Sequence, residues 1–180
     1  MEKAIQPNTK VFLSESPTNP YLNIMDLERL MDIFGKRDII VISDSTFATP
    51  YNQKPLEYGV HLVVHSATKY LGGHNDLLSG VLLGKKELTD PIREFLKITG
   101  GVIDPNSSYL LIRGLKTFPL RMERLNSNAQ VVAEHLEANS KINRVYYPGL
   151  SSHPHHDVAK RQMKGFGAVV TFEVKDDAEY

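Results

Sequence analysis

The sequence predicts an α/β fold, because short apolar runs alternate with stretches of helical spacing. Residues 39–42 are four β-branched aliphatic side chains, the pattern of a strand buried on both faces of a parallel sheet. Further apolar runs predict strands at residues 11–13, 61–64 and 81–83. Helical stretches between such strands imply crossover connections within one sheet.

The predicted helices follow in order along the chain. A turn-rich stretch with two prolines, residues 14–20, separates the first strand from a helix at residues 24–34, which Gly35 ends. From about residue 88 onward the spacing is mainly helical. It predicts helices at residues 91–98, 107–115 and 119–138.

The last forty residues differ in character from this helical stretch. Residues 144–147 and 168–174 predict two strands, and residues 151–157 predict a loop between them. We therefore expect a domain boundary near residue 140, with one domain at residues 1–139 and the beginning of a second at 140–180.

Composition excludes several classes of function. Lys plus Arg and Asp plus Glu number 21 each, so no net charge attracts nucleic acid or an anionic membrane. The absence of cysteine excludes disulfides, thiolate metal sites and a cysteine nucleophile, and it fits a reducing compartment. No apolar run approaches the ~18 residues of a membrane span, and the first ten residues lack the apolar core of a signal peptide. These features predict a cytosolic protein.

Asp44 is the first candidate functional residue. It ends the predicted strand of aliphatic residues, which places it at the carboxyl edge of the sheet, where open α/β folds bind ligands. A helix N-cap or a turn aspartate is the alternative interpretation of the same position.

A second candidate segment follows the strand at residues 61–64. Ser66 and Thr68 place two hydroxyls within three residues of Lys69, and paired glycines follow. Hydroxyls and loop amides at a strand end suit a bound phosphate, and a lysine there can form an imine with an aldehyde cofactor. A solvated surface lysine is the alternative. Pyridoxal 5′-phosphate needs both a lysine for its aldehyde and a carboxylate against its ring nitrogen, so Asp44 and Lys69 together suggest this cofactor.

Several motifs then carry a resemblance to a known family. They are ESPTNP at residues 15–20, DSTFATP at 44–50 and HSATKYLGGHND at 65–76, with further similarity at 106–117, 147–154 and 162–167. In order and spacing the chain resembles the Cys/Met-metabolism family of pyridoxal-phosphate enzymes, which includes cystathionine γ-synthase, cystathionine γ-lyase and methionine γ-lyase. The resemblance implies a fold-type I transferase, like aspartate aminotransferase, with an incomplete large domain and the start of a small α+β domain.

The resemblance also implies a role for each matching residue. Lys69 would hold the cofactor as a Schiff base and later act as acid and base. Asp44 would pair with the pyridine nitrogen, beside Thr46, and the family often has asparagine where this chain has Ser45. Ser66 and Thr68 would bind the cofactor phosphate. Asn19 would lie near the ring hydroxyl and the substrate carboxylate.

The reaction implied is γ-replacement, in which an activated homoserine ester and cysteine give cystathionine. The alternatives are γ-elimination by a cystathionine or methionine γ-lyase, and an inactive truncated paralogue or fragment. Family members have roughly twice this length, so we expect a partial chain of an enzyme that forms a homotetramer, a dimer of dimers, and acts on small amino acids. His153, His155 and His156 resemble a metal cluster, but we expect a loop and no metal site there.

Overall fold

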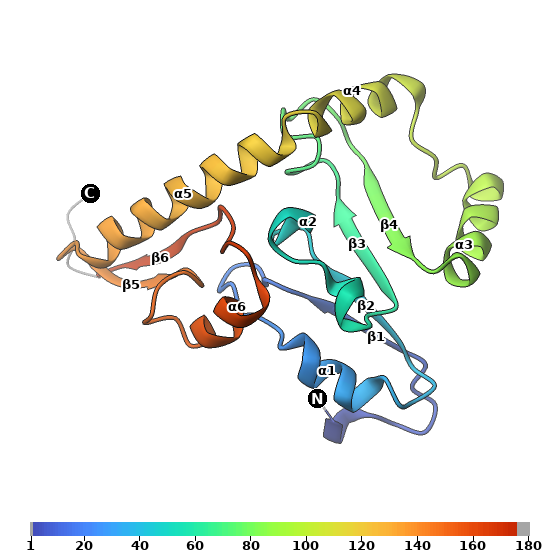
Figure 1. The fold of residues 1–180 in the computed structure, drawn as a ribbon, viewed down its shortest axis with the longest axis horizontal. Helices are drawn as coiled ribbons and strands as arrows, with labels where there is room; N and C mark the ends of the chain where they lie inside the picture. Colours follow the sequence, from blue (N-terminus) through green and yellow to red (C-terminus); the bar gives the residue numbers. More distant parts are fainter. Residues whose placement is uncertain (1, 176–180) are drawn as a thin grey trace.

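The computed structural model describes residues 2–175, which form two β-sheets connected by one long helix (Figure 1). The first sheet has the strand order β1 (Val11–Glu15), β2 (Ile40–Asp44), β3 (Leu62–Ser66) and β4 (Gly80–Gly84). The second sheet pairs β5 (Ile142–Tyr146) with β6 (Thr171–Val174) in antiparallel fashion. The predicted α/β class is therefore confirmed.

The first sheet is parallel through β3 and then reverses. Glu15 of β1 lies opposite Asp44 of β2, and Asp44 lies opposite Val64 of β3, so the carboxyl ends of these strands meet at one edge. Strand β4 instead runs antiparallel to β3, with Gly80 opposite Ser66. The direction of β4 was not predicted: the glycine-containing segment between β3 and β4 reverses the chain, so these two strands pair without a crossover.

Helix α1 (Leu27–Phe34) begins later than the spacing predicts. The side chain of Asp26 accepts a hydrogen bond from the Arg29 amide at 3.2 Å and caps the helix, so the preceding residues remain outside it. Ile24 is nevertheless buried, which explains its place in the apolar pattern. The buried face of α1 packs on the sheet in one core cluster made of Leu27, Leu30, Phe34, Ile39, Val41, Val60 and Val63.

The short elements after β2 were not predicted. They are the helix α2 (Thr49–Asn52) and the 3₁₀ turn η2 (Pro55–Tyr58), besides η1 (Glu2–Ala4) near the N-terminus. Elements of three or four residues are too short for an apolar period to be visible in the sequence.

The three predicted helices of the central region are confirmed, with shifted ends. They are α3 (Lys86–Thr99), α4 (Pro105–Leu115) and α5 (Phe118–Glu137). Helix α3 starts before Pro91, which the sequence suggests as its first residue; the helix continues through the proline, which cannot donate a backbone hydrogen bond. Helix α5 runs from α4 to the second sheet (Figure 1). There Ala129 and Ala133 pack with Val145, Tyr147 and Leu150.

The C-terminal part contains a helix that the sequence analysis missed. Helix α6 (His156–Gln162) begins inside the predicted loop at residues 151–157. Strand β6 begins at Thr171, three residues after the start of the predicted strand at 168–174. The helix is short, and only Ala159 and Gln162 of its residues are buried, so its apolar signal is weak. Within residues 2–175, none of the helices combines the length and the apolar character needed to cross a membrane.

Candidate cofactor site

Three predicted site residues lie together at the carboxyl edge of β2 and β3. The Thr46 hydroxyl donates to Asp44 Oδ1 at 2.6 Å, and the Thr46 amide donates to the same oxygen at 3.0 Å. The Ser66 amide in turn donates to Thr46 Oγ1 at 2.8 Å. Thr46 therefore connects the ends of the two strands, which places Asp44 and Ser66 in one hydrogen-bonded group.

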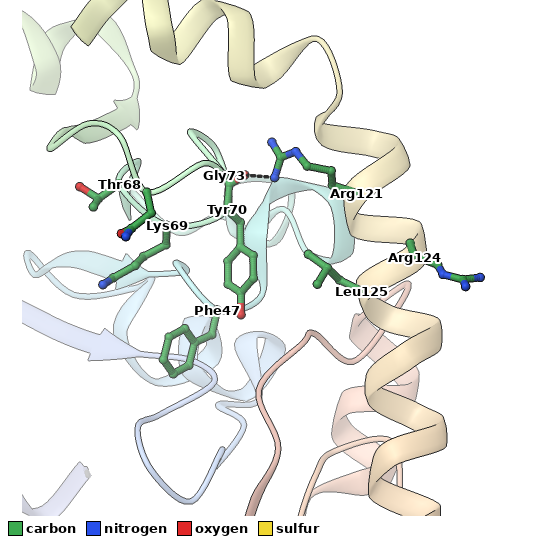
Figure 2. Close-up of a pocket in the computed structure, with 9 residues that line it drawn as sticks. Phe47, Thr68, Lys69, Tyr70, Gly73, Arg121, Arg124 and Leu125 are labelled. Carbon is green, nitrogen blue, oxygen red and sulfur yellow. Dashed lines mark hydrogen bonds between the residues drawn. The ribbon is translucent and has the colours of Figure 1, made fainter.

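Lys69 follows this edge in a tight turn and is exposed. A hollow of about 560 Å³ lies beside it. Figure 2 shows Lys69 and Tyr70 extending from the turn, Phe47 near the end of the lysine side chain, and helix α5 on the other side. The hollow is lined by Phe47, Thr68, Lys69, Tyr70, Gly73, Asn75, Arg121, Arg124 and Leu125. The structure therefore brings Lys69 and Thr68 to one concave surface, while Asp44, Thr46, Ser66 and Asn19 are not among its lining residues.

The Thr68 hydroxyl has a structural partner in this arrangement. It accepts a hydrogen bond from the Ser79 amide at 3.0 Å and donates to the Ser79 carbonyl at 3.3 Å. Because Ser79 immediately precedes β4, this pair fixes the Lys69 turn against the returning strand. The role of Thr68 in phosphate binding stays a prediction.

Asn19 lies in the segment that follows β1 and is exposed. Its amide donates a long hydrogen bond, 3.4 Å, to the Glu15 side chain. The C-terminal part of the chain holds the next residues of this segment. Thr171 donates from its hydroxyl to the Pro20 carbonyl at 2.7 Å, and His153 Nε2 lies 3.3 Å from the Tyr21 carbonyl.

The rings of His153, His155 and His156 each form hydrogen bonds with backbone groups. His155 Nδ1 accepts from the Ile24 amide at 3.2 Å, and His156 Nδ1 lies 2.9 Å from the Pro148 carbonyl. His153 is the most constrained of the three, since its Nδ1 accepts from the His155 amide at 3.2 Å while its Nε2 faces the Tyr21 carbonyl. These contacts require a neutral His153 ring with its proton on Nε2.

Acid should weaken this contact between the C-terminal part and the Asn19 segment. Burial, as the main cause, lowers the pKa of His153, and the nearby His155, Arg144 and His156 lower it further, against a smaller opposing effect of the Tyr21 carbonyl. The unfolded chain then binds the proton more readily than the folded chain, so stability is present above the ordinary pKa of about 6.5 and falls as the pH drops below it. We expect the urea midpoint of unfolding to fall between pH 7 and pH 5.

The control for this prediction is His135, an exposed histidine on α5. His153→Asn should flatten the pH dependence by at most about 1.4 kcal/mol per pH unit, while His135→Asn should leave it unchanged. Burial also lowers the pKa of His65, so the variant should keep part of the slope. An equal slope in the wild type and His153→Asn would contradict the prediction.

The sequence analysis missed Arg121, Tyr70 and Phe47 as residues of this site. Arg121 Nη1 donates to the Tyr70 carbonyl at 2.9 Å, a contact between residues 51 positions apart. Burial raises the pKa of the Tyr70 phenol, which therefore keeps its proton at neutral pH. Tyr70 could have been predicted from the sequence because it adjoins Lys69. No local spacing distinguishes Arg121 from other charged residues of a long helix.

The residues present fit pyridoxal phosphate. Among residues 2–175, neither the Lys69 amine nor the Ser66 hydroxyl makes a hydrogen bond within the chain, so both are available to a ligand. A primary amine, the free Ser66 hydroxyl and the Asp44 carboxylate near one sheet edge are groups that this cofactor requires for its aldehyde, its phosphate and its ring nitrogen.

Comparison with known proteins identifies a family that matches the chain. The model of the family described as Cys/Met metabolism PLP-dependent enzyme matches residues 1–180. The chain is 54% identical over 169 residues to cystathionine gamma-synthase 1, chloroplastic, of Arabidopsis thaliana, covering 94% of this chain and 30% of the relative. It is 50% identical over 182 residues to L-methionine gamma-lyase of Fusobacterium nucleatum subsp. polymorphum, covering 99% and 46%.

Solved structures agree as well. The crystal structure of cystathionine gamma-lyase from Lactobacillus plantarum, complexed with L-serine, matches with a TM-score of 0.95 and 40% identity, over 97% of this chain and 46% of that one. The chain thus spans less than half the length of these relatives, and the predicted fold-type I architecture is confirmed. By its sequence and its fold, this chain belongs to the Cys/Met metabolism family of pyridoxal-phosphate-dependent enzymes.

Proposed function

We propose that this chain supplies the cofactor lysine and the ring-nitrogen carboxylate of an enzyme that forms cystathionine by γ-replacement. The observation that carries the proposal is the free Lys69 amine in the hollow, beside a sheet edge where Asp44, Thr46 and Ser66 are bonded to one another. The substrates would be an activated homoserine ester and cysteine.

Each residue has a role in this proposal. Lys69 Nζ would hold the cofactor through its aldehyde and, when free of it, would take a proton from the substrate α-carbon and return protons later. Asp44 would hold a proton on the ring nitrogen, and pyridoxal phosphate so bound would supply an electron sink for the substrate. Ser66 would donate a hydrogen bond from its hydroxyl to the phosphate, and Thr68 would do so by turning its hydroxyl proton from the Ser79 carbonyl to the phosphate. Asn19 would lie toward the substrate carboxylate.

A specific observation favours a second reaction. The 50% identity to a methionine gamma-lyase is close to the 54% identity to the synthase, and both relatives align over nearly all of this chain. Gamma-elimination, which requires the same lysine and carboxylate, is therefore the alternative. A chain without catalytic activity is a third candidate, since the sequence spans only part of its relatives' length.

Product analysis separates these candidates. We expect purified protein carrying this sequence, given pyridoxal phosphate, an O-acylated homoserine and cysteine, to form cystathionine, and to form little 2-oxobutanoate. Mainly 2-oxobutanoate from cystathionine or methionine would favour a γ-lyase. Visible absorbance of lysine-bound cofactor without any product would favour the inactive chain. Absence of bound cofactor would contradict the proposal.

Organisation beyond the site is also part of the proposal. The second sheet has a core cluster of its own, to which the end of α5 contributes Ala129 and Ala133, and this supports domains at residues 1–139 and 140–180. Apolar side chains exposed on and between α3 and α4 support burial against further copies of the subunit, as in a homotetramer of two dimers; they are Phe95, Ile98, Val102, Tyr109 and Ile112. The cysteine-free composition supports a cytosolic location for the enzyme.

A further inference from the structure

Three backbone amides of the turn that carries Lys69 donate to carbonyls of the same turn. The Lys69 amide donates to the Ser66 carbonyl at 3.1 Å, the Gly72 amide to the Ala67 carbonyl at 2.8 Å and the Gly73 amide to the Lys69 carbonyl at 2.8 Å. None of these three bonds uses the carbonyl of Tyr70 or Leu71. Partly buried carbonyls need donors from elsewhere in the chain.

Arg121 at the start of α5 supplies those donors. Its Nη1 donates to the Tyr70 carbonyl at 2.9 Å, and its Nη2 makes a longer contact of 3.5 Å with the Leu71 carbonyl. The same guanidinium donates from Nη2 to the Gly114 carbonyl at 3.0 Å and from Nε to the Thr117 hydroxyl at 3.1 Å. One planar group thus joins the Lys69 turn to the end of α4 and to the first residue before α5, a geometry that a lysine ammonium cannot reproduce.

Two glycines allow this close contact. A Cβ on Gly114 would lie 2.2 Å from the Gly72 carbonyl oxygen, so the end of α4 rests directly on the backbone of the turn. A Cβ on Gly73, whose φ is +78°, would lie 2.0 Å from Arg121 Nη1. Beneath this contact Ala67, Leu71, Phe118 and Met122 form a buried cluster that packs the turn against the beginning of α5.

We propose that Arg121 is a positioning residue for Lys69: it fixes the turn through the Tyr70 and Leu71 carbonyls and thereby fixes where the lysine amine enters the hollow. This inference rests on the proposed function of Lys69 and adds to it a residue that acts through the backbone. Figure 2 shows Arg121 directed to the turn, whereas Arg124, one turn further along α5, extends away from it. Without Arg121 the two carbonyls lose their donors, so the turn samples other positions and the amine loses its fixed place.

The test compares Arg121→Gln and Arg121→Lys with Arg93→Gln. Arg93 is the control, because it is an exposed arginine of α3 and is not among the residues that line the hollow. The first readout is the rate at which added pyridoxal phosphate becomes attached to Lys69, followed by visible absorbance and located by borohydride reduction and peptide mass. The second is hydrogen exchange of the Gly72 and Gly73 amides, which needs no cofactor.

We expect Arg121→Gln to slow attachment by about tenfold to a hundredfold, the range that a misplaced reacting group costs. Exchange at Gly72 and Gly73 should rise by about tenfold or more, while the amides of β2 and β3 keep wild-type exchange. Arg121→Lys should recover part of both effects, because it keeps the charge and N–H donors, although on a single nitrogen. Arg93→Gln should change neither readout.

Three outcomes decide the inference. Wild-type attachment and wild-type exchange at the turn in Arg121→Gln would overturn it. Faster exchange throughout the first sheet in both Arg121 variants would also overturn it, because the arginine would then serve folding as a whole. If the wild-type chain attaches no cofactor at Lys69, the proposed function fails, and the exchange data still decide whether Arg121 orders the turn.

Discussion

Replacement of Lys69 by alanine should abolish covalent attachment of pyridoxal phosphate, to below the detection limit of reduction with borohydride. An aldehyde forms an imine only with a primary amine, and Lys69 is the one lysine among the described residues that line the hollow. The expected loss is complete, because the described residues that line the hollow include no second lysine. The measurement is visible absorbance of the bound cofactor together with the mass of the reduced peptide.

Two further variants test whether the primary amine of Lys69, rather than its charge or any lysine, is required. Lys69→Arg keeps a positive charge but provides no primary amine, so it should behave like Lys69→Ala. Lys97→Ala removes an exposed lysine of α3 that pairs with Glu94, and it should label like the wild type. A borohydride-stable label on Lys69→Ala at the wild-type level would place the attachment elsewhere and would contradict the assignment.

Asp44→Asn should slow turnover by about 100-fold or more, since removal of one electrostatic stabiliser of developing charge costs an enzyme roughly 100- to 1000-fold. The substituted amide keeps an oxygen that can accept the two hydrogen bonds from Thr46, so the strand ends should stay joined. It removes the negative charge that would hold a proton on the ring nitrogen. The measurement is hydrogen exchange at the α-carbon of a bound amino acid, alongside product formation.

The neighbouring Ser45 provides a matched control. It is fully buried, and its hydroxyl has no hydrogen-bond partner among residues 2–175. Ser45→Ala should therefore leave activity unchanged and should not destabilise the fold, because it removes a buried hydroxyl that has no partner. Equal α-carbon exchange rates in the wild type and Asp44→Asn would remove the carboxylate from the mechanism.

Strand ends were predictable from the sequence because apolar runs stop abruptly at polar residues. Asp44 and Ser66 close such runs, and the structure places both at one edge of the sheet. The direction of β4 was not predictable, since an apolar run has the same pattern whichever way the strand points. The register of β3 with β4 depends on the turn between them, whose course is set by contacts with Ser79 and with α4 and α5.

The limits of the site prediction have a similar cause. Lys69 and Thr68 were identifiable because hydroxyls and glycines surround them in the sequence, and the structure places both on the hollow. Arg121 was not, because its significance comes from carbonyls 50 and 51 residues away. Helix α6 was missed for a related reason. Gln162, its last residue, accepts a hydrogen bond from the Leu27 amide and donates one to the Met25 carbonyl, and a local apolar period does not reveal such contacts.

The contacts that hold the Asn19 segment also set an order of events during synthesis. Pro20 is held by Thr171, 151 residues later, and Ile24 by His155, 131 residues later. At ~5–20 residues per second, the ribosome needs roughly seven to twenty-six seconds to make the 131 residues between the latter pair. The strands β1 to β4 are complete well before then. The segment carrying Asn19 is therefore among the last parts of the site to settle, and a nascent chain that stops before His153 would present Lys69 without a fixed Asn19 segment.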